Sequence, residues 1–527
     1  MPAASAPAEV RFWRHPGIWL VLLSALLIRL PGLTAPYVER FVWRSIDNAA
    51  IARNFWQVSM NLLYPRVDWA GPEGYVETDL PLLMWVAGWL YSLLGQEDAW
   101  VGRGLTLLCF MLALGLFACL AHAWVGRRGA CVATGFLAFT PTSIFFSRLF
   151  QQDALMLAAQ MGALLCAWHW LSPAEHATHN TSQPPSPRSW LWGSGVMGCL
   201  ALGALVKPTA LLIGLPIAEL AFYRNGWRAV LQLPLYGVAA GALLLPLSWY
   251  LHAQQTYLTY GFTFGIFGGG HDKFQWCRFL SQREWYRELI KRFFTWHLTT
   301  PGVLLCLLGL LALVRWRSPA RVILLSWMLT MLLFIPLVAE GNYDMLYYQW
   351  VSIPPLAMLV GVLFRAESVR EPEAYPVRSN TGLRRLQLFG MGLLLLVPLH
   401  AYLVVRPAYE VHQGKNLALA EAIKTHVPPG ALLVDALAYD WHNPGGYNFE
   451  PMQFYYSGHK GWGMVEEDLT LTGVEVFRAK GAQFLVSWRT QALQEKASFW
   501  IPLTGHYPLI LDTAEAVIVD LRQPLQP

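Results

Sequence analysis

The first residues that could carry chemistry lie between two apolar stretches, in the polar segment 35–103. Asp47, Glu77 and Asp79 are acidic, and Arg103 follows at the edge of the next apolar stretch. Charge close to a bilayer is costly, so residues of this kind are candidates for function. A carboxylate can accept the proton of an attacking hydroxyl or amine, and a cation can stabilise a departing anion. The segment therefore predicts a proton acceptor and an anion-binding group at a membrane surface.

The composition is that of a membrane protein. Of the 527 residues, 55% are hydrophobic and only 13% are charged, whereas soluble domains carry about 25% charged residues. The 25 Trp and 21 Tyr residues suit a chain with many anchors at the membrane interface. The net charge of +5 is modest and gives no indication of nucleic-acid binding.

Loop charge predicts the topology of the chain. Arg11 and Arg14 precede the first apolar stretch, which places the N-terminus in the cytoplasm. Segment 80–94 is apolar but short, since about 15 residues at ~1.5 Å each do not cross a core of about 30 Å. If it spans, the later arginine clusters all face outward, and if it does not, they all face the cytoplasm. The positive-inside rule therefore predicts that residues 80–94 are re-entrant or interfacial.

The remaining apolar stretches predict an α-helical polytopic protein with about 11 spans and two large external loops, 35–103 and 252–300. Residues 49–60 predict an amphipathic helix at the outer interface that would hold Asp47 at the membrane surface. The expected spans are 17–33, 104–125, 130–146, 154–171, 190–206, 209–223, 229–251, 303–314, 322–339, 345–364 and 386–405.

The tail after Arg406 differs in pattern from the rest of the chain. Short apolar strands are expected at 431–435, 484–488 and 516–521, and helices at 416–425 and 473–480. This alternation predicts a small extracytoplasmic α/β domain. We therefore expect a transmembrane module, residues 1–405, followed by this domain, residues 406–527.

With this topology, the unusual polar groups collect at the outer face of the membrane, where they suit a reaction between an anionic lipid head group and a polar acceptor. They are Asp47, Glu77, Asp79, Arg103, Arg148, Asp153, Lys207, His271, Asp272, Arg278, Asn342, Tyr347 and Tyr348.

Several short motifs follow one another along roughly the first 365 residues. They are Asp47, then Glu77-Thr78-Asp79-Leu80-Pro81-Leu82, Arg103, Ser147-Arg148-Leu149-Phe150-Gln151-Gln152-Asp153, Lys207-Pro208-Thr209, and Tyr347-Tyr348-Gln349-Trp350-Val351-Ser352-Ile353-Pro354-Pro355. Their order resembles the GT-C glycosyltransferases of the protein O-mannosyltransferase and lipid A aminoarabinose transferase type. The resemblance implies a GT-C membrane fold and transfer of a sugar from a polyprenyl-phosphate donor to a lipid, glycan or protein acceptor.

The resemblance also implies roles for individual residues in an inverting mechanism. Asp47 takes the role of the general base, and Asp153 matches the second acidic position of the family. Location in a bacterial inner membrane is implied, with the site and the C-terminal domain facing the periplasm. The expected phosphate-binding cations are Arg103, Lys207 and Arg278, and the expected contacts to the acceptor or lipid carrier are Glu77, Asp79, Tyr347 and Tyr348.

Two departures from the family pattern affect these expectations. Asp47 is followed by Asn48, where the family often has a second acidic residue. Either Glu77 or Asp79 could take the place of the glutamate in the second motif. Glu77 and His271 are candidate ligands of a divalent metal, as some relatives use an acidic residue with a histidine. The simpler interpretation of His271 is a loop histidine in a glycine-rich segment.

Simpler interpretations exist for the other candidates too. Asp47 could be an exposed loop carboxylate or a partner of Arg44, and Arg103 could be an interfacial anchor. Asp153 could be a helix N-terminal carboxylate favoured by the dipole, and the two tyrosines could belong to an interfacial belt. A transporter or flippase is the alternative function, but it should show paired Gly/Pro-interrupted segments near the midplane, and no internal repeat is visible.

Overall fold

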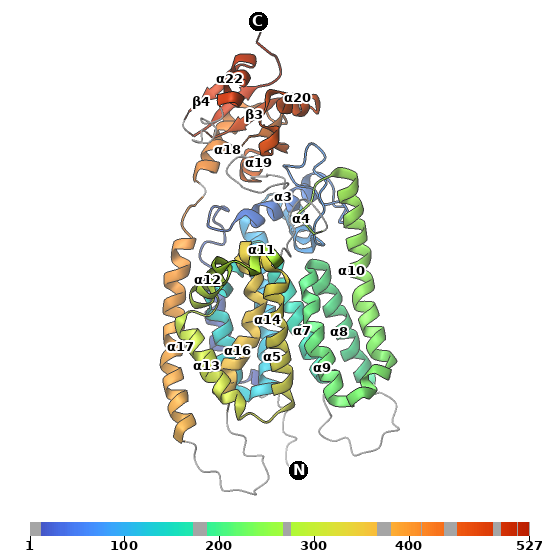
Figure 1. Ribbon diagram of the computed structural model, residues 1–527, viewed down its shortest axis with the longest axis vertical. Coiled ribbons are helices and arrows are strands. Elements are labelled where there is room, and N and C mark those ends of the chain that lie inside the picture. The colour runs from blue at the N-terminus through green and yellow to red at the C-terminus, as the bar shows by residue number, and fades with distance from the viewer. Residues whose placement is uncertain are drawn as a thin grey trace. The chain divides into compact units, whose positions relative to one another are not determined.

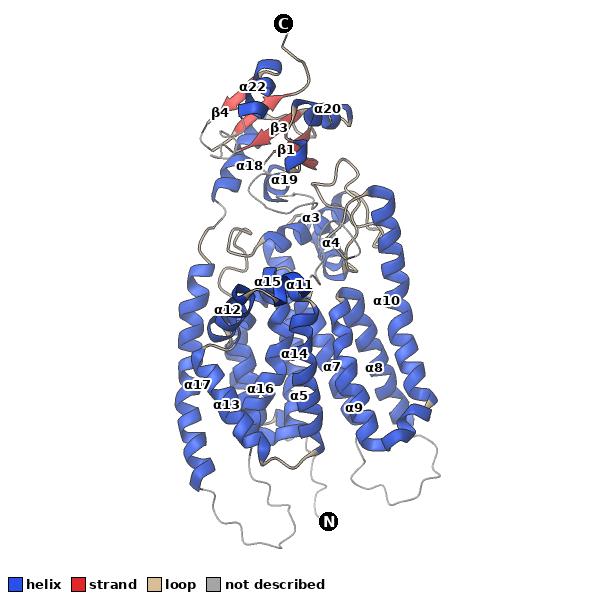
Figure 2. Cartoon of the chain, in the orientation of Figure 1, coloured by secondary structure: helices blue, strands red, loops and turns tan. Residues whose placement is uncertain are grey.

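The computed structural model describes residues 12–171, 187–266, 276–365, 381–412, 414–436, 451–488, 497–513 and 515–525. The described part is mainly helical, with a small sheet formed by residues near the C-terminus (Figures 1 and 2). The chain divides into two compact units. We call them the helical unit (Met1–Leu33, Arg103–Ser248 and Lys273–Pro407) and the mixed unit (Thr34–Gly102, Trp249–Asp272 and Ala408–Pro527).

The helical unit contains long helices joined by short helical turns. Three of its helices, α5, α10 and α17, continue across the unit boundaries. The elements are α2 (Pro16–Leu27), α5 (Ala99–Phe139), α6 (Pro141–Phe146), α7 (Asp153–Leu171), α8 (Pro187–Val206), η1 (Pro208–Ile213), α9 (Gly214–Asn225), η2 (Gly226–Leu231), α10 (Leu233–Tyr260), α11 (Trp276–Leu280), α12 (Arg283–Arg292), η3 (Phe293–His297), α13 (Thr300–Val314), α14 (Pro319–Leu337), α15 (Ala339–Asp344), η4 (Leu346–Ser352), α16 (Ile353–Leu363) and α17 (Thr381–Ala408).

Several of these helices present apolar side chains that the protein does not cover. Leu244 of α10 is 65% exposed, Leu311 of α13 is 59% exposed, and Leu395 of α17 is 76% exposed. Within the described ranges, six helices are long and apolar enough to cross a membrane, or up to seven if a bent helix pair forms one span. Lipid solvates such surfaces, so the helices have the properties of membrane spans.

Each predicted span contains a helix, but some of these helices are long enough to cross a membrane and others are shorter. The expected spans 104–125 and 130–146 fall largely within α5, whose helical geometry breaks at Gly126, where φ is 72°. Pro16–Leu27 and Trp190–Val206 are shorter apolar helices. Because short helices can lie in the bilayer or at its surface, the number of 11 crossings stays a prediction.

The mixed unit contains the predicted α/β fold together with residues 34–102, which were predicted to form the first external loop. Its elements are α3 (Trp43–Gln57), α4 (Leu82–Leu94), α18 (Gly414–His426), β1 (Leu432–Asp435), α19 (Pro451–Ser457), β2 (Lys460–Gly463), η6 (Glu466–Asp468), α20 (Leu471–Ala479), β3 (Phe484–Ser487), α22 (Ala497–His506), β4 (Leu509–Asp512) and β5 (Val517–Asp520). Helix α4 has 13 residues and spans only about 20 Å at ~1.5 Å per residue. The short element expected at residues 80–94 is therefore present.

The described strands form one sheet in the order β2-β1-β3-β5-β4. Strand β1 pairs in parallel with β2 and β3, whereas β5 pairs antiparallel with β3 and β4. The three predicted strands correspond to β1, β3 and β5, whose side chains are mostly buried. The edge strands β2 and β4 were not predicted. Strand β2 contains two glycines and has no apolar run. Strand β4 begins with the apolar run Leu509–Leu511, a local signal that could have identified it.

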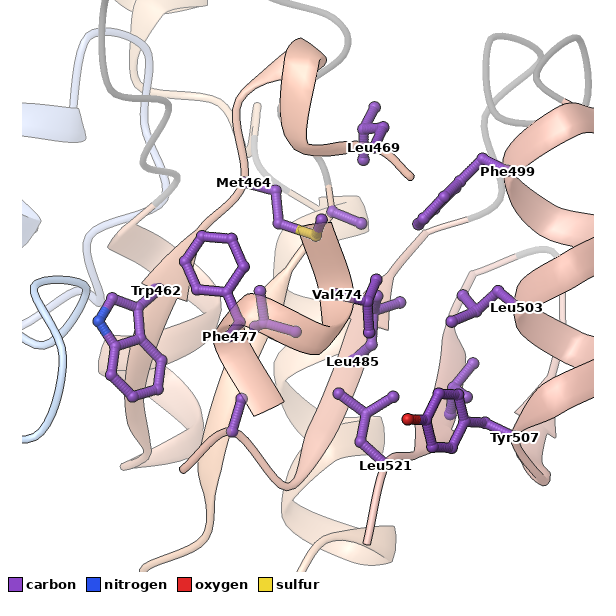
Figure 3. Close-up of a cluster of buried hydrophobic side chains, with 14 of the residues drawn as sticks. Trp462, Met464, Leu469, Val474, Phe477, Leu485, Phe499, Leu503, Tyr507 and Leu521 are labelled. Carbon is purple, nitrogen blue, oxygen red and sulfur yellow. The ribbon is translucent and has the colours of Figure 1, made fainter. Parts of the chain in front are cut away.

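One face of the sheet packs into an apolar core that includes helices α20 and α22. Val474 and Phe477 come from α20, and Phe499 and Leu503 from α22, and all of them are buried (Figure 3). Trp462 of β2 lies at the edge of this cluster, with its ring 6.2 Å from that of Phe477 (Figure 3). This core explains why the C-terminal residues fold as a compact layer.

A hairpin formed by residues 66–75 extends the sheet at β2. Its two arms meet at the antiparallel pair Arg66 and Tyr75. Its tip pairs with β2, since the Gly461 amide donates to the Asp68 carbonyl at 2.9 Å and the Gly71 amide donates to the Gly461 carbonyl at 2.6 Å. The hairpin thus satisfies backbone groups that an open sheet edge would leave unpaired. This pairing explains why residues 34–102 and 408–527 form one unit.

Candidate active site

Asp47 lies within helix α3 of the mixed unit. The helix begins at Trp43, six residues before the predicted start at residue 49, so Asp47 belongs to the helix and not to the loop before it. Only 1% of Asp47 is exposed, and its neighbour Asn48 is also buried. Packing buries both polar and apolar side chains of α3, and the position of this helix at the outer interface stays a prediction. The interpretation of Asp47 as an exposed loop carboxylate is excluded.

Helix α3 is held on one side by α4. A Cβ atom at Gly88 of α4 would lie 2.8 Å from Phe55 Cβ and 3.0 Å from the Ala52 carbonyl oxygen. Only glycine permits so close an approach of the two helices. The short apolar helix α4 therefore supports the helix that carries Asp47.

Polar contacts hold the other side of α3. The Arg53 guanidinium forms an ion pair with Asp68 at 2.6 Å and donates to the Tyr455 carbonyl at 2.8 Å. The Asn54 amide donates to the second Asp68 oxygen at 2.9 Å. The Tyr455 hydroxyl donates to Glu97, beyond the end of α4. These contacts fix α3 to both the hairpin and helix α19.

The Asp47 carboxylate has one donor and one unused oxygen. The Trp69 indole N–H donates to Oδ1 at 2.9 Å. Oδ2 is buried and has no hydrogen-bond partner within the described residues. Burial raises the pKa of Asp47 to about 7, although the Arg44 charge and the Trp69 hydrogen bond act to lower it and Asp68 acts to raise it. A carboxyl group with such a pKa can accept a proton near neutral pH.

Glu77 and Asp79 lie in the strand-like segment that follows the hairpin. The side chain of Glu77 is fully buried, and its backbone pairs with residues 262–264 through the Phe262 carbonyl and the Phe264 amide, both at 3.0 Å. Asp79 accepts a hydrogen bond from the Tyr250 hydroxyl at 3.0 Å. The two acidic residues thus have different surroundings, and which of them corresponds to the family glutamate stays a prediction.

In the helical unit, the structure brings together Asp153, Lys207, Tyr347 and Tyr348. Asp153 is the first residue of α7, and one of its oxygens lies 2.5 Å from the Lys207 ammonium. That ammonium lies 4.6 Å from the centre of the Tyr347 ring and 4.7 Å from that of Tyr348. The ion pair is largely buried, with side-chain exposures of 14% for Lys207 and 9% for Asp153. The two tyrosine rings therefore make cation–π contacts with the Lys207 ammonium.

A buried chain of hydrogen bonds holds η4, the turn that carries the two tyrosines. Thr142 contacts one nitrogen of His297 at 2.9 Å, and the other nitrogen contacts the Gln349 side-chain oxygen at 2.7 Å. The Gln349 amide donates to the Asn342 side-chain oxygen at 3.2 Å. His297 was not predicted, since a single histidine before an apolar helix has no distinctive pattern.

The other two predicted phosphate-binding cations, Arg103 and Arg278, come from other elements than the Lys207 cluster. Arg103 is fully buried in α5, so the interpretation as an exposed interfacial anchor does not apply to it. Arg278 is exposed on α11, which packs against α15. His271 lies outside the described residues, and within them no group of three or more His, Cys, Asp and Glu residues could hold a metal ion. The metal site stays a prediction, and no step is derived through it.

Trp69, Asp68 and Arg53 were also missed in the sequence. Trp69 is 2% exposed and contacts Asp47, although 22 residues separate them in the chain. Its only signal in the sequence is an aromatic residue beside an acidic one, which occurs widely in surface loops. The tertiary fold therefore supplies the immediate partner of the candidate base.

Comparison with known proteins agrees with this architecture. Residues 79–251 match the family model described as dolichyl-phosphate-mannose-protein mannosyltransferase. No curated protein matches the chain. Among solved structures, the crystal structure of ArnT from Cupriavidus metallidurans in the apo state is similar with a TM-score of 0.63 at 16% identity, covering 97% of this chain and 98% of that chain.

Two further solved structures have the same overall fold. ArnT from Cupriavidus metallidurans bound to undecaprenyl phosphate has a TM-score of 0.62 at 15% identity, with 95% of this chain and 97% of that chain covered. The oligosaccharyltransferase from Archaeoglobus fulgidus, in a complex with Zn and sulfate, has a TM-score of 0.57 at 12% identity, with 89% and 67% covered.

These comparisons identify the fold of the protein. The fold is that of the GT-C glycosyltransferases, a class of multi-pass membrane proteins. The family match in residues 79–251, together with this fold, confirms the resemblance and the prediction of a glycosyltransferase. Enzyme chemistry is therefore favoured over a transporter or flippase.

Proposed function

We propose that the protein transfers a sugar from a polyprenyl-phosphate donor to an acceptor, with inversion at the anomeric carbon and Asp47 as the general base. The observation that carries the proposal is the buried Asp47 carboxylate. One of its oxygens is oriented by Trp69, the other has no partner within the described residues, and its pKa is about 7. A carboxyl group with this pKa is partly ionised near neutral pH, and its unpartnered oxygen is the one we assign to the acceptor proton.

The reaction is a single displacement. The acceptor oxygen or nitrogen attacks the anomeric carbon and forms the new glycosidic bond, while the bond from that carbon to the phosphate oxygen breaks. The acceptor proton passes to Asp47, and the bonding electrons leave with the polyprenyl phosphate. Attack from the face opposite the leaving group inverts the configuration of the sugar.

The leaving phosphate requires cations, and Lys207 is the best supported of the three candidates. Its ammonium has three N–H donors, one of which reaches Asp153, and the rings of Tyr347 and Tyr348 hold it in place. Arg103 and Arg278 are assigned to the same task by resemblance. A lipid-phosphate donor is supported by the ArnT complex with undecaprenyl phosphate and by archaeal AglB in complex with dolichol-phosphate.

Glu77 and Asp79 are assigned to acceptor or carrier contacts, and Glu77 with His271 to the candidate metal site. We place the protein in a bacterial inner membrane with its chemistry and its C-terminal domain at the periplasmic side. This orientation rests on loop charge, and the acceptor is a lipid, a glycan or a protein. The C-terminal domain is expected to influence acceptor choice, since it folds together with residues 34–102, which carry Asp47.

Substitution of the base tests the proposal. Asp47→Asn keeps the shape of the side chain but cannot accept the proton, so sugar transfer should fall by about 100-fold to 10,000-fold. Transfer is measured with a radiolabelled polyprenyl-phosphate sugar in membranes, and expression and insertion are compared with those of the parent. Asp98→Asn is the control and should keep full activity. It alters another carboxylate of the segment 34–102, which accepts hydrogen bonds from Gln96 and Trp100. Turnover of Asp47→Asn at the parent rate would remove Asp47 as the base.

A further inference from the structure

A pocket of about 180 Å³ lies within the mixed unit, at the tip of the 66–75 hairpin. The hairpin forms one wall, the end of α10 with the residues that follow it forms the second, and strand β2 forms the third. Its principal side chains are Glu73, Tyr75, Tyr260, Phe262 and Trp462. None of these residues was predicted to have a function.

Half of the eight lining residues are aromatic. The centres of the Tyr75 and Tyr260 rings are 4.6 Å apart, with the ring planes tilted by 42°. Trp462 lies against the backbone of Gly71, where an added Cβ would be 2.8 Å from the indole nitrogen. Gly71 also has a φ of +76°, so a side chain there would be strained and would displace the indole ring. The glycine at position 71 therefore allows the Trp462 ring to lie against the hairpin backbone and to line the pocket.

The size and polarity of the pocket suit one sugar ring. A cavity of about 150 Å³ holds benzene, so this pocket has room for one six-membered ring. The C–H groups of a sugar carry small positive charge and are attracted to the negative faces of aromatic rings. The exposed carboxylate of Glu73 and the tyrosine hydroxyls can bond to sugar hydroxyls, as the few polar groups of a binding pocket do.

The charges disfavour a cationic occupant. Aromatic rings beside a carboxylate can also bind an ammonium group. Here, however, the Arg66 guanidinium lies 4.3 Å from the centre of the Tyr75 ring and donates to the Tyr75 hydroxyl at 2.6 Å. This positive charge already occupies one aromatic face, and it repels a second cation. A neutral sugar ring is therefore the better fit.

One side chain connects the pocket with Asp47. Trp69, which donates to the Asp47 carboxylate, packs edge-on against Phe262 with ring centres 6.2 Å apart. Phe262 lines the pocket, and the next residues after Trp69, Ala70 and Gly71, line it too. The candidate base and the pocket thus share the same short segment of the hairpin.

We propose that this pocket binds a sugar ring of a glycan-bearing acceptor, next to the ring whose hydroxyl is glycosylated. The proposal rests on the proposed function, because it takes Asp47 as the base that faces the acceptor. It narrows the acceptor from a lipid, glycan or protein to one that carries carbohydrate before the reaction. Tyr260, which is 36% exposed, and Glu73 form the rim that the incoming sugar meets first.

Saturation-transfer NMR on the purified full-length protein in detergent micelles tests binding directly. The probes are methyl α-D-mannopyranoside, methyl β-D-galactopyranoside and methyl α-D-arabinofuranoside, each added alone. Saturation of the ring protons of at least one glycoside is expected. In Tyr260→Ala the affinity should fall about fivefold, because a stacked aromatic contact is lost. Tyr257→Ala, one turn earlier on the same helix and outside the pocket, should bind like the parent.

Three results would overturn the proposal: no saturation of any glycoside, equal saturation in the parent and Tyr260→Ala, or displacement of the glycoside by tetramethylammonium.

Transfer kinetics then separate this proposal from the proposed function. Tyr260→Ala should raise KM for a glycan acceptor while kcat changes little, whereas Asp47→Asn should lower kcat and still bind the glycoside. If Asp47→Asn loses transfer but no glycoside binds, the pocket assignment fails alone. If a glycoside binds but Asp47→Asn keeps full turnover, the assignment of the base fails alone.

Discussion

The two candidate carboxylates, Asp47 and Asp153, are both buried, yet their surroundings differ. Asp47 in the mixed unit has a neutral indole N–H as its hydrogen-bond donor and one oxygen without a partner within the described ranges. Asp153 in the helical unit lies at a helix N-terminus and forms an ion pair with Lys207. Burial raises the pKa of Asp47 to about 7, whereas Asp153 is bound directly to a lysine ammonium. The different partners therefore suit Asp47 for accepting a proton and Asp153 for holding Lys207.

The largest expected effect is the loss of stability on breaking the ion pair. Lys207→Met leaves Asp153 as a buried charge without its partner, which costs about 3 kcal/mol or more. Thermal unfolding of the purified protein in detergent should show a clearly lower Tm. Asp153→Asn combined with Lys207→Met should recover part of the loss, because neither buried group is then charged. A parent-like Tm for Lys207→Met would remove the contrast between the two carboxylates.

Asp47→Asn is the matched comparison at the other carboxylate. The pKa of Asp47 in the folded protein is raised from 3.8 to about 7, so folding favours its protonated form. The stability that this preference contributes is present below pH 3.8 and is lost as the pH rises towards 7. At pH 8 the Asp47→Asn variant, which has no charge at this position, should therefore unfold at the same or a higher temperature than the parent.

The pH dependence of transfer should show a limb set by Asp47. Below pH 7 the carboxyl is increasingly protonated and cannot accept a proton, so kcat/KM should fall about tenfold per pH unit. Above pH 7 the rate should level off. Measurement of kcat/KM between pH 5.5 and 8.5 checks this expectation, and a flat profile would contradict it.

Trp69→Phe sharpens the same measurement. The indole hydrogen bond lowers the pKa of Asp47, so its loss should move the limb to higher pH by about one unit, the scale of a hydrogen bond to a charged group. Trp85→Phe, which removes an indole donor to the Met60 carbonyl in the same loop, should leave the limb in place. A limb that moves equally in both variants would indicate a general change in the loop.

The smallest effect is expected at the tyrosines beside Lys207. Tyr348→Leu removes one aromatic face from the ammonium and should cost about 1 kcal/mol of stability. Tyr348→Phe keeps the ring and should unfold at nearly the parent temperature. If the phenylalanine variant is as unstable as the leucine variant, the hydroxyl and not the ring face supports the site.

Strong local patterns allowed much of the fold to be predicted. The strands β1, β3 and β5 are apolar on both faces, and α4 is too short to span a bilayer of normal thickness, so each was found from its own residues. The pairing of the 66–75 hairpin with β2 was not predicted, because backbone hydrogen bonds between segments almost 400 residues apart leave no periodic pattern. The start of α3 was missed for a related reason, since tertiary packing buries polar residues that a local pattern assigns to a loop.

The sequence by itself determined the class of molecule, the α/β class of the tail and the candidates Asp47, Asp153 and Lys207. Apolar length, loop charge and the order of the motifs depend on residues that are near one another in the chain. Only the tertiary structure decided how these residues are paired: Asp47 with Trp69, Lys207 with Asp153 and two tyrosine rings, and the aromatic pocket from three separate segments. Desolvation and hydrogen bonding depend on which distant segments cover a side chain. They set the pKa of a carboxyl group, and its spacing in the sequence does not.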